Sequence, residues 1–122
     1  MAGYIRSKTK RAETTALNTK VNKQLLDEFK SYCQELGCPM NVLIETFMKQ
    51  YLAGNFCLND EDIVKWKKDK DDKEVLNTTF NKEIYHEFRD FCKGKGFFLK
   101  HILCAFMEKI ITKEYELMLV KK

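Results

Sequence analysis

A seven-residue segment occurs twice in this 122-residue chain, 59 positions apart, and it constrains the fold more than any other feature. The first copy, at 17–23, reads LNTKVNK, and the second, at 76–82, reads LNTTFNK. The match continues downstream in residue pairs of the same type: Glu28 and Glu87, Phe29 and Phe88, Cys33 and Cys92, Gly37 and Gly96, Phe47 and Phe106, Met48 and Met107. A repeat of this kind predicts one structural unit built twice.

Each copy begins with an alternation of side chains that is typical of a β-strand. In residues 16–21, Leu17, Thr19 and Val21 fall on one side and Ala16, Asn18 and Lys20 on the other. The second copy, residues 75–80, repeats the pattern. A frayed helix start is the alternative for one short segment, and the recurrence of the alternation favours the strand.

Two helices are expected to follow each strand. Asn22 and Asn81 are suitable N-caps, because an amide oxygen can accept hydrogen bonds from the first helical turn. The first helix is predicted over 23–36 and ends at Gly37, where a left-handed cap is needed. The second helix is predicted over 40–53 and is apolar around a wider arc, which indicates a central position.

The repeat divides the chain into four parts. We assign residues 1–15 to a basic, disordered arm, 16–53 to the first repeat, 54–74 to a connector, and 75–122 to the second repeat with a C-terminal tail. Asn59 and the acids after it predict a short helix in the connector. One copy alone is too small to build an adequate core, so the copies are expected to combine.

Composition narrows the class of protein. The net charge is +4, and the arm carries Arg6, Lys8, Lys10 and Arg11 against Glu13. This arm fits either a polyanionic partner or a solvated terminus. The five cysteines show no framework spacing and indicate a reducing, cytoplasmic environment. We find no signal peptide and no apolar run of the roughly 18 residues that a membrane span needs.

No motif points to catalysis. The two histidines, His86 and His101, have no repeated carboxylate or thiol partner, and the cysteines lack the spacing of a closed metal site. The sequence has no glycine-rich phosphate loop or nucleophile motif. We therefore expect no enzyme activity, no metal, no cofactor and no small-molecule substrate.

The order of alternating strand, capping Asn, amphipathic helix, Gly and apolar helix resembles the ribbon-helix-helix superfamily of Arc, MetJ and CopG repressors. Two copies in one chain are similar to the TraY-type conjugation accessory proteins. The resemblance implies a mainly α-helical fold with a two-stranded antiparallel β-ribbon, in which the repeats form an intramolecular pseudo-dimer. Strand pairing by exchange between two chains is the alternative.

The resemblance also implies that the ribbon enters the major groove of double-stranded DNA, which admits a two-stranded ribbon. The base-facing positions carried over from the family are Ala16, Asn18, Lys20, Val75, Asn77 and Thr79. The alternative is that these are only solvent-facing strand residues. Because the two copies present different side chains, we expect a non-palindromic site.

Family members hold DNA phosphates at the start of the second helix, where free N–H groups face the backbone. This chain departs from the family there, because Pro39 and Phe98 replace the usual Ser or Thr cap. The predicted phosphate contacts are Asn41 and Lys100 at these helix starts, with Arg6, Lys8, Lys10 and Arg11 in the arm.

Three functions follow from these observations. The first is a sequence-specific DNA-binding protein, either an accessory factor at a plasmid transfer origin or a transcriptional repressor. In the accessory role, its further partners would be a relaxase or neighbouring copies on adjacent sites. The second is an antitoxin, which the short tail disfavours. The third is a helical interaction module that never touches DNA.

Overall fold

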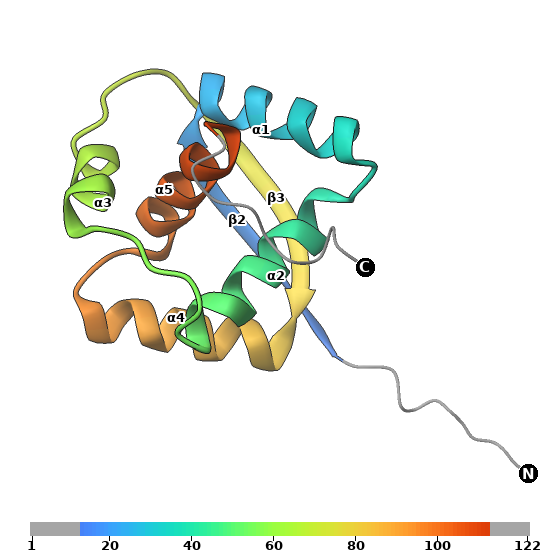
Figure 1. Cartoon of the computed structure of the whole chain (residues 1–122), viewed down its shortest axis with the longest axis vertical. Coiled ribbons are helices and arrows are strands. Elements are labelled where there is room, and N and C mark those ends of the chain that lie inside the picture. The colour runs from blue at the N-terminus through green and yellow to red at the C-terminus, as the bar shows by residue number, and fades with distance from the viewer. Residues whose placement is uncertain (1–12, 113–122) are drawn as a thin grey trace, which may run out of the picture.

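The computed structural model describes residues 13–112, and within them the chain forms two strands and five helices (Figure 1). The elements in chain order are β2 (Thr14–Asn22), α1 (Lys23–Leu36), α2 (Met40–Leu52), α3 (Asp60–Lys67), β3 (Lys73–Asn81), α4 (Lys82–Lys95) and α5 (Leu99–Ile111). The basic arm residues Arg6, Lys8, Lys10 and Arg11, and the tail after Thr112, lie outside the described residues. The prediction of a mainly helical chain is confirmed.

The two strands pair with each other in a single antiparallel sheet. The register runs from Thr14 opposite Asn81 to Asn22 opposite Lys73, and it places Asn18 directly opposite Asn77. The predicted pairing is confirmed, and both strands belong to the same chain. Each strand begins two residues earlier and ends one residue later than the alternation indicates, because Thr14 also pairs with Asn81 and Asn22 with Lys73.

Capping interactions set the limits of α1 and α4 as expected. The side-chain oxygen of Asn22 accepts from the backbone N–H of Leu25 at 2.8 Å, and that of Asn81 accepts from Ile84 at 3.1 Å. Both helices end at a glycine in the left-handed conformation, with φ of 71° at Gly37 and 84° at Gly96. The predicted bounds of α1, 23–36, are confirmed.

The helices cover one face of the sheet and enclose the core. In Figure 1, α2 and α5 cross in front of the two strands, while α1 and α4 lie at opposite ends. At the centre, the rings of Phe47 and Phe106 stack with centroids 3.9 Å apart. Phe88 meets Phe47 edge-on at 5.7 Å, and Phe29 meets Phe106 edge-on at 5.9 Å. These aromatic contacts join the two halves of the chain.

The connector contains α3, which packs against α5. Its Trp66 donates a hydrogen bond from Nε1 to Glu108 at 3.1 Å, and Asp62 pairs with Lys109 at 3.2 Å. The two apolar helices differ at corresponding positions: Cys104 and Ala105 of α5 are small and buried, whereas the corresponding residues of α2 are glutamate and threonine. None of the described helices is long and apolar enough to cross a membrane.

Candidate nucleic-acid interface

The face of the sheet that points away from the helices carries every residue predicted to contact bases. Burial alternates along both strands: Leu17 and Leu76 are buried beneath the sheet, and their neighbours in the chain are exposed. The exposed residues include the six predicted ones, Ala16, Asn18, Lys20, Val75, Asn77 and Thr79, together with Thr14 and Lys73 at the strand starts. The alternation arises because successive side chains of a strand point to opposite faces. The structure thus brings the six residues together on one surface.

Cross-strand pairing arranges the six predicted residues in three rows. Asn18 and Asn77 form the middle row, with Lys20 opposite Val75 on one side and Ala16 opposite Thr79 on the other. Because alternate residues of a strand lie about 6.6 Å apart, the three rows span roughly 13 Å along the sheet. The face therefore has a symmetric centre and two chemically different ends.

The two asparagines in the middle row are free to bind a partner. Within residues 13–112, neither side-chain amide makes a hydrogen bond. An amide presents a donor and an acceptor side by side, and this pair matches the N7 and N6 edge of adenine in the major groove. In the flanking row, Val75 is 48% exposed, which leaves a methyl-bearing surface beside Lys20.

The starts of α2 and α5 differ from those of α1 and α4. Their N-cap residues, Pro39 and Phe98, make no side-chain capping hydrogen bond. The first N–H groups of both helices therefore lack a side-chain acceptor of the kind that Asn22 supplies to α1, and such groups favour an anion. Of the residues predicted to contact phosphates, Lys100 is exposed beside one of these starts and Asn41 is half-buried beside the other.

His101 adds no charge to the start of α5 at neutral pH. Its Nδ1 atom is buried without a hydrogen-bond partner within the described part of the chain. Burial lowers the pKa of this imidazole from its ordinary 6.5, and the nearby charges of Lys100 and Lys67 lower it further. Lys100 is therefore the cationic side chain in the first turn of this helix.

The charges around the edge of the sheet largely cancel. Glu74 lies 3.9 Å from Lys23 and 3.8 Å from Lys30, and Lys82 lies 3.4 Å from Glu13. Among the six residues predicted to contact bases, Lys20 is the charged one, and Lys73 on the same face pairs with Asp69. Much of the excess positive charge of the sequence thus falls in the arm, outside the described residues.

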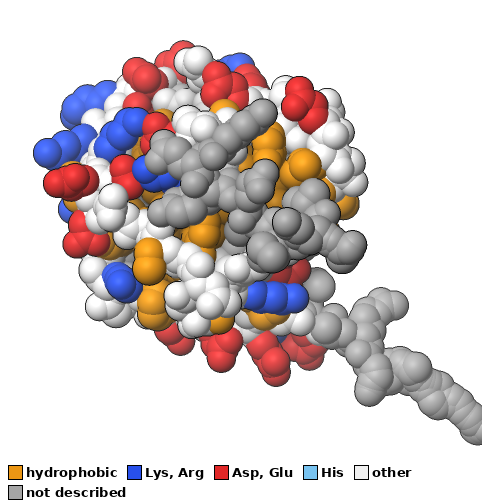
Figure 2. Space-filling model, viewed as in Figure 1, with side chains coloured by type: hydrophobic (Ala, Val, Ile, Leu, Met, Phe, Trp, Pro, Cys, Tyr) orange, Lys and Arg blue, Asp and Glu red, His pale blue; other side chains and the backbone are white. Residues whose placement is uncertain are grey.

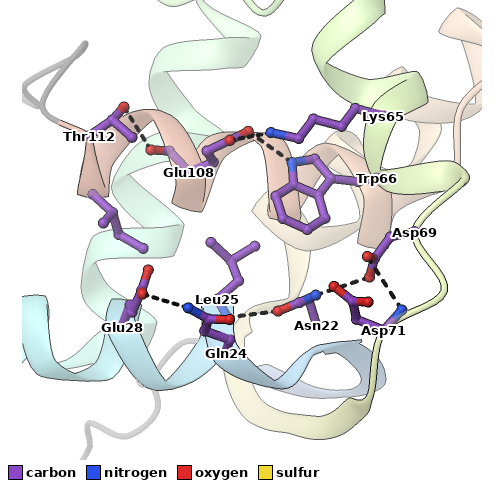
Figure 3. Close-up of a pocket in the computed structure, with 11 residues that line it drawn as sticks. Asn22, Gln24, Leu25, Glu28, Lys65, Trp66, Asp69, Asp71, Glu108 and Thr112 are labelled. Atoms are coloured by element: carbon purple, nitrogen blue, oxygen red, sulfur yellow. Dashed lines mark hydrogen bonds and ion pairs between the residues drawn. The ribbon is translucent and has the colours of Figure 1, made fainter.

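A cavity of about 310 Å³ lies where α1, α3 and α5 meet (Figure 3). Asn22 donates from Nδ2 to Asp69 at 3.1 Å, and Lys73 reaches the same carboxylate at 2.8 Å. Burial acts to raise the pKa of Asp69, but the hydrogen bonds from Lys73 and Asn22 outweigh it and lower the pKa below its ordinary value. These contacts hold the connector against the end of the sheet at which Asn22 pairs with Lys73.

Sequence reasoning missed two residues that anchor the connector, Asp69 and Glu108. Glu108 accepts from Trp66 and also pairs with Lys65 (Figure 3). The available signal was that Glu108 is the one carboxylate in the mostly apolar residues 99–111. Asp69 lies in a run of alternating lysine and aspartate, where no single residue stands out. Within residues 13–112, no group of His, Cys, Asp and Glu side chains is placed to hold a metal ion.

The fold and this surface define a small helical protein that presents an antiparallel ribbon with a polar row at its centre. No protein-family model matches the chain, and no curated protein or solved structure matches it significantly.

Proposed function

We propose that this chain is a sequence-specific double-stranded DNA-binding protein that inserts the β2–β3 ribbon into the major groove. The observation that carries the proposal is the outward pair of Asn18 and Asn77, directly opposite each other and without side-chain partners within the described residues. A major groove about 12 Å wide admits a two-stranded ribbon, and amide side chains are suited to adenine. In this function the protein is a binding module rather than an enzyme.

The proposal includes an intramolecular pseudo-dimer of ribbon-helix-helix type. Two residue pairs that correspond under the 59-residue repeat also contact each other: Asn18 with Asn77 and Phe47 with Phe106. Corresponding residues can meet in this way when an approximate two-fold axis passes between them. The equal lengths of corresponding elements, 9 residues for the strands and 14 and 13 for the helices, support the same arrangement.

The two ends of the ribbon are expected to read different bases. Lys20 can donate to guanine O6 or N7, and Val75 beside it can contact a thymine methyl group. At the other end, Ala16 and Thr79 offer methyl groups and one hydroxyl, which suit thymine-containing pairs. A central element contacted by the asparagines should therefore be flanked by unequal halves, and the DNA site should be non-palindromic.

Phosphate contacts would come from the starts of α2 and α5 and from the arm. Their first N–H groups carry the positive end of each helix dipole, and Asn41 and Lys100 lie beside them. Arg6, Lys8, Lys10 and Arg11 add four positive charges that can displace counterions from DNA. Affinity should consequently fall steeply as the salt concentration rises.

The biological role that we propose is an accessory factor at a plasmid transfer origin, with a relaxase or neighbouring copies as further partners. This choice depends on the tandem arrangement and its resemblance to TraY-type proteins. A transcriptional repressor would use the same ribbon on an operator. An antitoxin would in addition bind a toxin through a separate segment.

Selection from a pool of random duplexes tests DNA binding without knowledge of the natural site. The full-length protein is used to enrich duplexes over several rounds, and binding of the enriched duplex is then titrated by fluorescence anisotropy at two salt concentrations. We expect an asymmetric consensus with an A·T-containing centre. Failure to enrich any sequence, or equal affinity for enriched and scrambled duplexes, would contradict the proposal.

A further inference from the structure

We propose that residues 4–11 of this chain occupy an acidic groove between α2 and α4 when no DNA is bound. The groove has a volume of about 670 Å³. Its lining combines apolar side chains with two carboxylates and one lysine: Lys49, Leu52, Ala53, Ile84, Glu87, Asp90 and Phe91. Phe91 is 36% exposed, and within residues 13–112 neither Glu87 nor Asp90 has an ion-pair partner. Figure 2 shows acidic side chains along the lower edge of the molecule, where α4 lies.

A corresponding groove lies between α1 and α5, and side chains of α3 cover it in part. Five lining residues of the α2–α4 groove have counterparts, 59 positions away, that line the cavity between α1 and α5. These counterparts are Leu25, Glu28, Glu108, Ile111 and Thr112. In that cavity, Trp66 and Lys65 of α3 extend toward α5 and reach Glu108 (Figure 3). The α2–α4 groove has no such cover among the described residues.

The position of α3 in the chain identifies the segment that would cover the open groove. Residues 60–67 form α3, and they lie as many residues before β3 as residues 1–8 lie before β2. Equivalent backbone hydrogen bonds follow: the N–H of Lys23 donates to the carbonyl of Asp72 at 2.9 Å, and that of Lys82 donates to Glu13 at 3.0 Å. Glu13 is thereby fixed at the first residue of α4.

The arm has the length and composition that the groove requires. From Glu13 to Ile5 an extended chain reaches about 26 Å, whereas α4 is about 21 Å long. Tyr4 and Ile5, which correspond to the apolar Ile63 and Val64 of α3, supply side chains for the apolar lining. The four basic residues of the arm, Arg6, Lys8, Lys10 and Arg11, are opposite in charge to the carboxylates of Glu87 and Asp90.

One position distinguishes the two grooves. Lys65 pairs with Glu108 in the α1–α5 groove, but the counterparts of these residues are Arg6 and Lys49, which repel each other. The arm must therefore place its charges toward α4 rather than toward α2. The acids of α4 then compete with DNA phosphates for the same cations, and this consequence depends on the proposed function.

A photo-crosslinking experiment on the full-length chain tests the docking directly. Benzoylphenylalanine replaces Tyr4, the protein is irradiated without DNA, and the crosslinked peptides are identified by mass spectrometry. We expect a crosslink within one molecule to residues 49–53 or 84–91. Crosslinks to α1 or α3, crosslinks between two copies, or no crosslink would each overturn the proposal.

Paired variants test the charge complementarity. The double variant Glu87→Gln with Asp90→Asn should lower the crosslink yield at least threefold. The matched control, Asp27→Asn with Glu35→Gln on the exposed surface of α1, should leave the yield unchanged. An equal loss in both variants, or no loss in the first, would contradict the proposed docking.

The same experiment separates this proposal from DNA binding. A crosslink in the groove together with no enrichment of any duplex would support arm docking and contradict the proposed function. Where a duplex is enriched, adding it in excess should lower the crosslink yield, because phosphates compete for the arm. An enriched duplex that leaves the crosslink intact would show that the arm takes no part in binding.

Discussion

Asn18 and Asn77 lie directly opposite each other at the centre of the β2–β3 sheet, and the same two residues correspond under the 59-residue repeat of the sequence. In an antiparallel pair of equivalent strands, two corresponding residues lie opposite each other only when the register is centred on them. The proposed pseudo-dimer requires that centring, since a register shifted by one residue would turn the polar row toward the helices.

Replacement of the central asparagines should change base preference. Asn18→Ala and Asn77→Ala should each weaken binding to the enriched duplex by about 1–3 kcal/mol and relax the preference at one central position. Because both side chains are exposed, thermal stability should change little. The matched control is Asn55→Ala, in the exposed loop after α2, which should bind as the parent does. Uniform weakening on all duplexes would indicate phosphate contact instead.

The stacked aromatic pair should dominate the stability of the fold. Phe47→Ala and Phe106→Ala each remove a fully buried ring and should lower the free energy of unfolding by about 3–5 kcal/mol. Phe98→Ala is the control, because that ring is 67% exposed. Urea denaturation followed by circular dichroism measures the difference. Comparable losses for Phe98 and Phe47 would contradict the described core.

The connector helix should depend on Glu108. Glu108→Ala removes the acceptor of the Trp66 indole N–H and the partner of Lys65, and we expect a loss of about 1 kcal/mol. Trp66 is the single tryptophan, so its fluorescence reports on this contact. Emission should shift to longer wavelength in the variant as the indole gains water. Lys65→Ala, which leaves the indole hydrogen bond in place, should shift it less.

Alkaline pH should destabilise the protein through its buried thiols. Burial raises the pKa of Cys92 to about 12, and burial with the nearby Cys38 raises that of Cys33 to about 11, from an ordinary 9.0. In the unfolded chain these thiols ionise near 9, so their contribution to stability is complete below that pH and is lost as pH rises toward 11–12. Urea denaturation at several pH values should show a shallower decline for Cys92→Ala.

Much of the fold follows from local signals that agree with one another. Asn22 and Gly37 mark the ends of α1, because Asn22 accepts a hydrogen bond from the first turn and Gly37 adopts the left-handed conformation of the C-cap. The repeat supplies the same pair of signals for α4. The alternation along the strands identified the six outward residues, since a strand places successive side chains on opposite faces.

The position of α3 was beyond the reach of sequence reasoning. The pattern of Asn59 and the following acids indicates a helix, but not the surface on which it packs. That surface is formed by α5, whose Glu108 accepts the hydrogen bond of Trp66 from 42 residues away in the chain. Tertiary contacts of this kind produce no periodic pattern in the local sequence.

The most direct measurement of the central claim replaces adenine by 7-deazaadenine, one position at a time, at the centre of the enriched duplex. This change removes the N7 acceptor from the major groove and keeps base pairing. We predict that the full-length protein binds the modified duplex about 1–3 kcal/mol more weakly, and that the loss disappears when Asn18 and Asn77 are both alanine. Equal affinity of the unaltered protein for modified and unmodified duplexes at every central adenine would contradict insertion of the ribbon into the major groove.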